Sequence, residues 1–164
     1  MNTVTKWLTR DSVVLGLKAT DAKHLCGEVA KFVAHRQNLD ENVIFRALWR
    51  REQCGSTGLG HGIAIPHARI PGISDPVVLF ARTRDPIPFD SPDRQPVSAF
   101  FVILVPEHAN EDHLRILATV SEMFSDKKFR RQLEVETDAA AIQRLFGNWA
   151  GESDLGAPKR LRAI

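Results

Sequence analysis

One histidine of this chain stands in a sequence context suited to chemistry. His67 follows Pro66 at the end of a short apolar run, and that run follows the glycine-rich stretch GSTGLGHG at residues 55–62. A neutral imidazole has one unprotonated, nucleophilic ring nitrogen and an ordinary pKa of roughly 6.5, so it can accept a phosphoryl group reversibly. The alternative is a structural histidine that closes a strand end and bonds to backbone. Residue types alone leave both interpretations open.

The glycine-rich stretch also has two interpretations. Four glycines in eight positions predict a loop, in which backbone N–H groups can approach a ligand as they do in phosphate-binding loops. A structural turn explains the same residues. No Lys-Ser or Lys-Thr follows the last glycine and no G-x-G-x-x-G occurs, which excludes a P-loop and a dinucleotide fingerprint.

Three further groups of polar residues could suggest other chemistry. His108, Asp112 and His113 lack the i, i+4 histidine pair and the glutamate of a zinc protease helix, so we expect no metal. Cys54 has no base at motif spacing, which argues against thiol catalysis. Arg51 shares a predicted helix with two other arginines. By itself it is a solvated surface charge or part of a docking face for an acidic partner.

Periodic apolar residues predict the helices and strands that would position these groups. Helices are expected to begin near residue 22, at residue 40 or 41, after the cap Asn110, near residue 129 and after the cap Thr137. Strands are expected at residues 13–17, 63–66, 77–83 and 98–105, the last buried on both faces. The helix after Asn110 should turn Leu114 inward. Residues 85–97 hold four prolines and predict a loop.

The alternation of strands and helices indicates an α/β fold, with a mixed sheet flanked by α-helices. The length of 164 residues and the lack of a dividing linker predict a single domain over residues 1–150. Residues 151–164 lack a periodic pattern, and we expect them to form a flexible tail.

Composition excludes several classes of protein. Hydrophobic residues make up 43% and charged residues 26%, which is typical of a globular chain. The net charge of +2 gives no general reason to expect nucleic acid or an anionic membrane as a partner. The longest apolar run, residues 99–105, is far shorter than the roughly 20 residues that cross a bilayer. With two cysteines and no signal-peptide pattern, a soluble cytoplasmic protein is expected.

The sequence GSTGLGHGIAIPHAR at residues 55–69 resembles the active-site signature of the phosphotransferase-system IIA proteins of the fructose/mannitol family. Within that family it is most similar to the nitrogen-regulatory branch. Further likeness lies in FRALWRREQ, DPIPFDSPDRQPV and VILVPEHANEDHLRILATV, and it extends over residues 10–147. The resemblance implies a mixed sheet of about five strands flanked by helices, consistent with the alternation above.

The resemblance also implies roles for particular residues. His67 matches the histidine that accepts a phosphoryl group from a histidine phosphocarrier protein, and no cofactor or metal is implied. Arg51 matches an arginine that faces the active site, and His113 matches its second histidine. Backbone N–H groups of the glycine-rich stretch are candidate phosphate donors, at Gly55, Ser56, Thr57, Gly58, Gly60 and Gly62.

The sequence departs from the family pattern at three positions. Ala68 and Arg69 stand where the family commonly has glycine and lysine, and the charge is kept. His61 stands where the regulatory branch often has asparagine. None of these changes removes a group that phosphoryl transfer needs.

Three functions remain open from the sequence. The first is a regulatory IIA protein whose phosphorylation state sets which targets, such as kinases or transporters, it binds. The second is a sugar-transport IIA component that passes phosphate to a IIB domain. The third is an interaction module without phosphotransfer, against which His67, Arg51 and His113 argue. Whether the chain counts as an enzyme or a carrier stays open.

Overall fold

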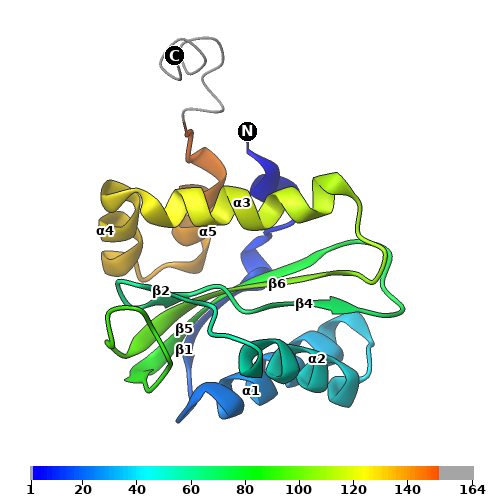
Figure 1. Ribbon diagram of the computed structural model, residues 1–164. Helices are drawn as coiled ribbons and strands as arrows, with labels where there is room; N and C mark the ends of the chain where they lie inside the picture. Colours follow the sequence, from blue (N-terminus) through cyan, green and yellow to red (C-terminus); the bar gives the residue numbers. More distant parts are fainter. Residues whose placement is uncertain (1, 152–164) are drawn as a thin grey trace, which may run out of the picture.

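The computed structural model describes residues 2–151, which form a six-stranded sheet covered by helices on both faces (Figure 1). The strands are β1 Val13–Leu17, β2 Gly58–Gly60, β3 Ile63–Ala64, β4 His67–Ile70, β5 Val77–Ile87 and β6 Val97–Pro106. The helices are α1 Ala22–Gln37, α2 Glu41–Gln53, α3 Glu111–Ser125, α4 Lys127–Val135 and α5 Ala139–Asn148. Two short 3-10 helices precede β1, at Thr3–Lys6 and Arg10–Ser12.

The sheet is mixed, with the strand order β1-β5-β6-β3-β2. β5 and β6 pair antiparallel, whereas β1 runs parallel to β5. β3 and β4 both pair parallel with β6, one after the other: Ile63 lies opposite Ala99, and His67 lies opposite Ile103. Together β3 and β4 therefore act as one strand beside β6 that is interrupted at Ile65 and Pro66, and β2 pairs with the β3 part of it.

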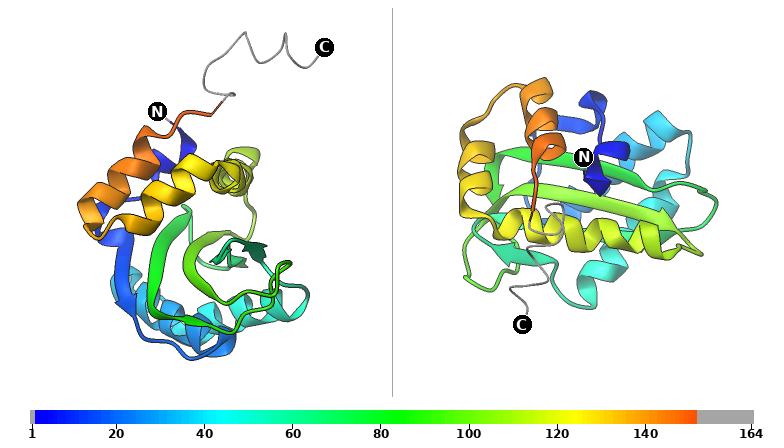
Figure 2. Two further views of the ribbon diagram at one scale, coloured as in Figure 1. Left: turned by 90° about the vertical axis from the view of Figure 1, so that its left-hand side faces the viewer. Right: turned by 90° about the horizontal axis from the view of Figure 1, so that it is seen from above.

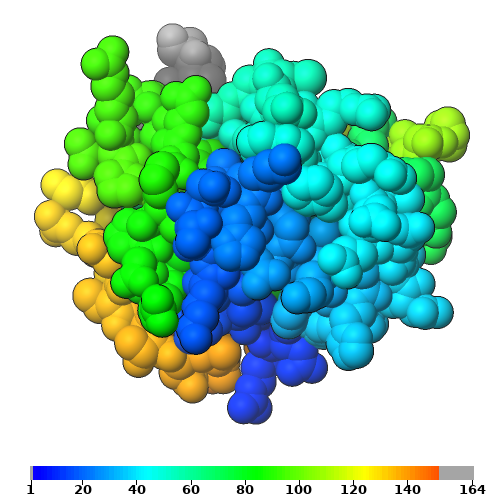
Figure 3. Space-filling model, turned by 90° about the horizontal axis from the view of Figure 1, so that it is seen from below, coloured from blue at the N-terminus to red at the C-terminus, as the bar shows by residue number. Residues whose placement is uncertain are grey.

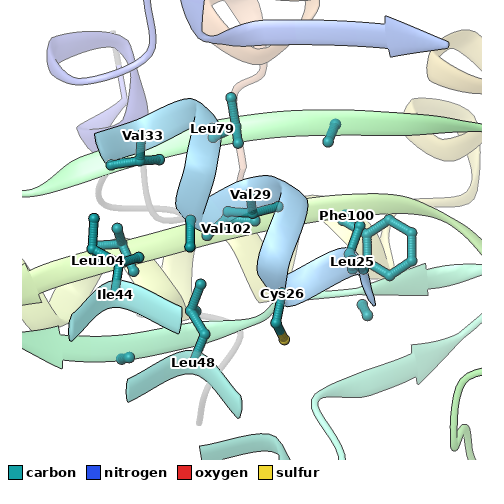
Figure 4. Close-up of a cluster of buried hydrophobic side chains, with 14 of the residues drawn as sticks. Leu25, Cys26, Val29, Val33, Ile44, Leu48, Leu79, Phe100, Val102 and Leu104 are labelled. Atoms are coloured by element: carbon teal, nitrogen blue, oxygen red, sulfur yellow. The ribbon is translucent and has the colours of Figure 1, made fainter. Parts of the chain in front are cut away.

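Two apolar layers hold the helices to the sheet. The layer between the sheet and helices α1 and α2 is mainly aliphatic, with Leu25, Val29 and Leu48 packed against Val102 and Leu104 (Figure 4). These two helices cover that face of the molecule side by side, in blue and cyan (Figure 3). The opposite layer, below α3, α4 and α5, is rich in aromatic rings, which are Phe80, Phe101, Phe124, Phe129 and Phe146.

The two ends of the described chain meet on the aromatic side. The N-terminal segment lies beside α5 (Figure 2). The side-chain amide of Asn2 donates to the backbone oxygens of Phe146 at 2.7 Å and Trp149 at 2.9 Å. This contact ties the start of the domain to its last helix. The tail predicted for residues 151–164 lies outside the described residues except for Gly151.

The predicted α/β class and mixed sheet are confirmed, and so are the helix start at residue 40 or 41 and the cap Asn110. The sheet has six strands rather than about five, because the glycine-rich stretch contains β2, which was expected to be loop. Glycine is what allows this strand: a Cβ on Gly58 would lie 2.6 Å from the backbone oxygen of Asp90. The backbone of β2 therefore passes a neighbouring loop too closely for any side chain.

Other boundaries also differ from the predictions. Of the strand predicted at residues 63–66 only β3, Ile63–Ala64, forms, and β4 at His67–Ile70 was not predicted. β5 continues to Ile87, although the prolines predicted a loop from residue 85; the register shifts between Arg82 and Ile87, and such an irregularity tolerates Pro86. Asp138 rather than Thr137 caps α5, through its carboxylate and the amide of Ala141.

Candidate functional site

His67 is the first residue of β4, directly after the interruption between β3 and β4. Its Nδ1 lies 2.8 Å from the backbone oxygen of Ile65. A carbonyl oxygen only accepts, so Nδ1 carries the hydrogen of the neutral ring and donates it. The other nitrogen, Nε2, then keeps its lone pair. The backbone at the strand break thus fixes which nitrogen of His67 is nucleophilic.

Burial keeps this imidazole neutral. Removal of the ring from water lowers the pKa of His67 below its ordinary 6.5; the hydrogen bond to Ile65 and the charge of Glu52 oppose the shift, and Arg51 adds to it. At pH 7 the ring is therefore unprotonated at Nε2. A neutral ring is the form that can attack phosphorus.

A hollow of about 580 Å³ opens beside His67. It lies between the end of α2, strand β4 and the first turn of α3, and it brings together Arg51, His67 and His113. Arg50 and Arg69 also line it, and Asp and Glu are absent among the lining residues that the structure describes. The hollow therefore favours an anion next to a nucleophilic nitrogen.

His113 lies in the first turn of α3, where Asn110 accepts a hydrogen bond from the His113 amide at 2.9 Å. Its ring packs edge-on against Trp7, with 6.3 Å between ring centroids. Within residues 2–151, Nδ1 of His113 is buried and has no hydrogen-bond partner. A buried polar atom without a partner costs about 1–3 kcal/mol, so this ring gains from an added hydrogen bond.

Arg51 and Glu52 connect the last turn of α2 to the glycine-rich stretch. Nη1 of Arg51 donates to the backbone oxygen of Gly55 at 2.6 Å, which leaves the rest of its guanidinium available at the hollow. The carboxylate of Glu52 accepts from both the amide of Thr57, at 3.0 Å, and its hydroxyl, at 2.6 Å. Two adjacent side chains thus set the path by which the chain leaves α2.

The glycine-rich stretch lies beside this hollow but does not line it. The amide of Gly55 donates to the Glu52 backbone, that of Thr57 to the Glu52 side chain, and that of Gly58 to Ser56 Oγ at 3.0 Å. The six residues expected to hold phosphate are absent from the residues lining the hollow. Their phosphate-binding role stays a prediction from the resemblance, and within residues 2–151 their observed contacts are structural.

The sequence predicts the wrong orientation for Leu114 and gives no role to Glu52. Leu114 was expected to face inward, but it is 46% exposed and lines the hollow. Leu114 lies near the start of α3. The buried face of this helix begins two residues later, at Ile116. Glu52 contacts a residue five positions on, a spacing set by the loop and not by helix periodicity. No sequence pattern would have found it.

Neither a metal site nor a membrane-spanning helix is found within residues 2–151. No group of three or more His, Cys, Asp or Glu is arranged to hold a metal ion there. In the same part of the chain, no helix is long and apolar enough to cross a membrane.

Comparison with known proteins identifies one family. The model of the phosphoenolpyruvate-dependent sugar phosphotransferase system, EIIA 2, matches residues 6–149. The nitrogen regulatory protein of Bradyrhizobium diazoefficiens is 35% identical over 85% of this chain and 91% of its own. The fructose-specific EIIABC component of Bacillus subtilis is 31% identical over 85% of this chain and 22% of its own. The crystal structure of IIA-Ntr from Neisseria meningitidis aligns with a TM-score of 0.82 and 35% identity, covering 88% of this chain and 99% of the other.

Proposed function

Because the chain belongs to the EIIA 2 family of the phosphoenolpyruvate-dependent sugar phosphotransferase system, we propose that it is a nitrogen-regulatory IIA protein phosphorylated at Nε2 of His67. One observation carries the site: the carbonyl of Ile65 holds Nδ1, so Nε2 is the free nucleophile. The lowered pKa of His67 supports the same assignment, since it keeps that nitrogen unprotonated at neutral pH.

The proposed step moves one phosphoryl group between two imidazoles. The P–N bond to the histidine of a phosphocarrier breaks, and its electron pair returns to the carrier's ring. The lone pair of His67 Nε2 forms the new P–N bond. Nδ1 keeps its hydrogen, and the Ile65 oxygen stabilises the positive charge that the phosphorylated ring acquires.

Charge stabilisation is the main task left to the protein, because the transition state of phosphoryl transfer is loose. Arg51 and His113 line the hollow with His67, and we assign them as donors to the phosphoryl oxygens. The first turn of α3 adds the positive end of a helix dipole beside the same hollow. The exposed apolar side chain of Leu114 at the rim suits contact with the protein that brings the phosphate.

The regulatory role follows from the relatives. Phosphorylation would add about −2 charge to the docking face around His67, which changes the partners that face can bind. The regulated targets would be proteins such as kinases or transporters, and transfer from a phosphocarrier would place the protein in the cytoplasm. The likeness to the fructose-specific component of Bacillus subtilis supports a second candidate, a sugar-transport IIA protein that passes phosphate to a IIB domain.

The test is phosphoryl transfer with defined components. We expect enzyme I, a histidine phosphocarrier and phosphoenolpyruvate to label the protein with one acid-labile phosphate. His67→Gln should abolish the label, whereas the control His108→Gln, at an exposed histidine outside the hollow, should keep it. A label that maps to another residue would overturn the site. Failure to label beside an active control IIA protein would favour an interaction module.

A second arm separates regulation from transport. Phosphorylated protein is mixed with fructose- and mannitol-specific IIB proteins, and transfer is followed over time. A nitrogen-regulatory protein should transfer far more slowly than a sugar IIA control. Transfer at the control rate would support the sugar-transport alternative.

A further inference from the structure

A second hollow, of about 440 Å³, lies at the other end of α3 from His113. α4 forms one side of it, and the beginnings of β3 and β6 lie beneath, at the end of the sheet seen under α4 (Figure 1). Apolar side chains of Ile63, Ala99 and Leu133 lie at its floor, beside the polar Ser98. A cavity of this size suits a small molecule, since ligand pockets span about 300–1,000 Å³.

Positive charge is concentrated around this floor. The rim carries four cationic side chains from two elements, which are Arg82, Lys127, Arg130 and Arg131, together with His61. Glu134 is the one carboxylate lining the hollow among the described residues. The whole chain carries only +2, so this is a local excess. Such an excess beside an apolar floor favours an anion that also has apolar surface.

The charge on this rim is not neutralised by ion pairs. Within residues 2–151, none of the four cationic side chains lies within 4.0 Å of a carboxylate. Arg82 donates to the backbone oxygens of Glu136, at 2.6 Å, and Leu133. Arg130 donates to the backbone oxygen of Phe124 at 2.8 Å. Neutral carbonyls thus hold both guanidinium groups in place without removing their charge.

Arg82 is also partly buried, next to the ring of Phe80. Burial lowers the pKa of Arg82, and the charges of Glu134 and Glu136 oppose that shift. The guanidinium still stays charged at neutral pH, because the ordinary pKa of arginine lies far above 7. An anion beside it would compensate a charge that water solvates incompletely.

We propose that this hollow binds a small organic phosphate, with the phosphate held between Arg82 and the cationic side chains of α4. Lys127 and Arg131 are exposed and have rotamer freedom, so they can close over the anion. The apolar floor takes the organic part of the ligand. The cationic side chains come from one turn of α4 and one residue of β5, a compact cluster that suits a small molecule better than a nucleic acid or an acidic peptide, which need an extended track of charge.

This site is separate from the phosphorylation site. Ile63 and Ala99 are paired partners on the floor, and His67 and Ile103 are paired partners four residues further along the same two strands. Four residues of strand span about 13 Å, which is too far for one phosphate to contact both sites. The proposal therefore does not depend on phosphorylation of His67. It gives the domain a place to sense a metabolite.

The test uses inorganic pyrophosphate as the probe and the full chain. We expect saturable binding by calorimetry at constant ionic strength, with amide shifts at Ile63 and Ala99 in NMR spectra. The double variant Lys127→Gln/Arg131→Gln should bind at least tenfold more weakly. Both side chains are exposed, so the fold should be kept. The matched control Lys23→Gln/Lys128→Gln removes the same charge from exposed positions outside the hollow and should bind like the native protein.

Four results would overturn the proposal. They are absence of saturable binding, equal weakening in both double variants, loss of binding in His67→Gln, and displacement of pyrophosphate by a hexaglutamate peptide that binds more tightly. Either of the first two results would mean that pyrophosphate is attracted only by the general positive charge of the surface and has no specific site. The third would assign the anion to the hollow beside His67, and the fourth would assign the surface to an acidic protein partner.

Discussion

The hollows at the two ends of α3 both concentrate positive charge, but the groups within them differ. The helix has 15 residues and is about 22 Å long, so each end forms its own electrostatic environment. Arg50, Arg51 and Arg69 line the first hollow around a neutral imidazole with a free lone pair. The second has cationic side chains around an apolar floor.

This difference separates binding from group transfer. Positive charge attracts an anion in either hollow, but a covalent phosphoryl intermediate also needs an unprotonated nucleophile. Burial and the Ile65 carbonyl provide that nucleophile at His67. At the rim of the second hollow the ring of His61 is exposed, and within residues 2–151 no hydrogen bond orients it as the Ile65 carbonyl orients His67. The first hollow is thus suited to transfer and the second to reversible binding.

Substitution of His113 is expected to have the largest effect on phosphorylation of His67, and it should distinguish the two hollows most clearly. His113→Ala should slow phosphorylation of His67 by about 100- to 1,000-fold, the usual cost of removing one donor to a developing charge. Pyrophosphate binding at the second hollow should not change. Initial rates of labelling and calorimetry check the two statements. A fall in rate below threefold would exclude His113 from the proposed transfer.

The next effect is expected at Arg51. Arg51→Gln should slow labelling by roughly 10- to 100-fold, because a hydrogen bond to a charged group contributes about 1.5–3 kcal/mol. Arg51→Lys should recover part of the rate, since it keeps the charge but loses the planar fork. Arg51 also bonds to Gly55, so thermal unfolding must be measured alongside the rate. If the lost rate follows only lost folding, the residue is structural.

The smallest effect is a dependence of stability on pH. The folded pKa of His67 lies below 6.5, so below pH 6.5 the unfolded chain binds a proton that the folded chain does not. Stability should therefore fall as pH drops from 6.5 toward the folded pKa, and this share of the loss should vanish in His67→Gln. Melting temperatures of both proteins from pH 8 to 5 provide the check. Parallel curves would contradict the lowered pKa.

Local signals predicted much of the fold. The caps Asp40 and Asn110 mark helix starts because their side chains bond to amides two or three residues on. β2 was not predicted, because its glycines form a strand by pairing with β3, and glycine content by itself indicates a loop. Leu114 was placed wrongly because helix periodicity does not tell where a helix first meets the sheet.

The two hollows were predictable to different degrees. Arg51, His67 and His113 are far apart in sequence, and only the family resemblance grouped them before the fold brought them to one cavity. Arg82 and Arg131 come from β5 and α4, and no motif links them. Their convergence depends on how α4 packs over the end of the sheet. Such a site follows from tertiary structure alone.

The interruption between β3 and β4 has a consequence for the speed of repeated transfer. In an unbroken strand the carbonyl of Ile65 would belong to the ladder, whereas here it is released to orient a side chain. The loss of rotational freedom of that ring is then incurred once, when the chain folds, and not at every encounter with a carrier. In the transfer proposed for His67, a phosphoryl donor and a phosphoryl acceptor would meet the same nitrogen in the same orientation, as reversible exchange at low barrier requires.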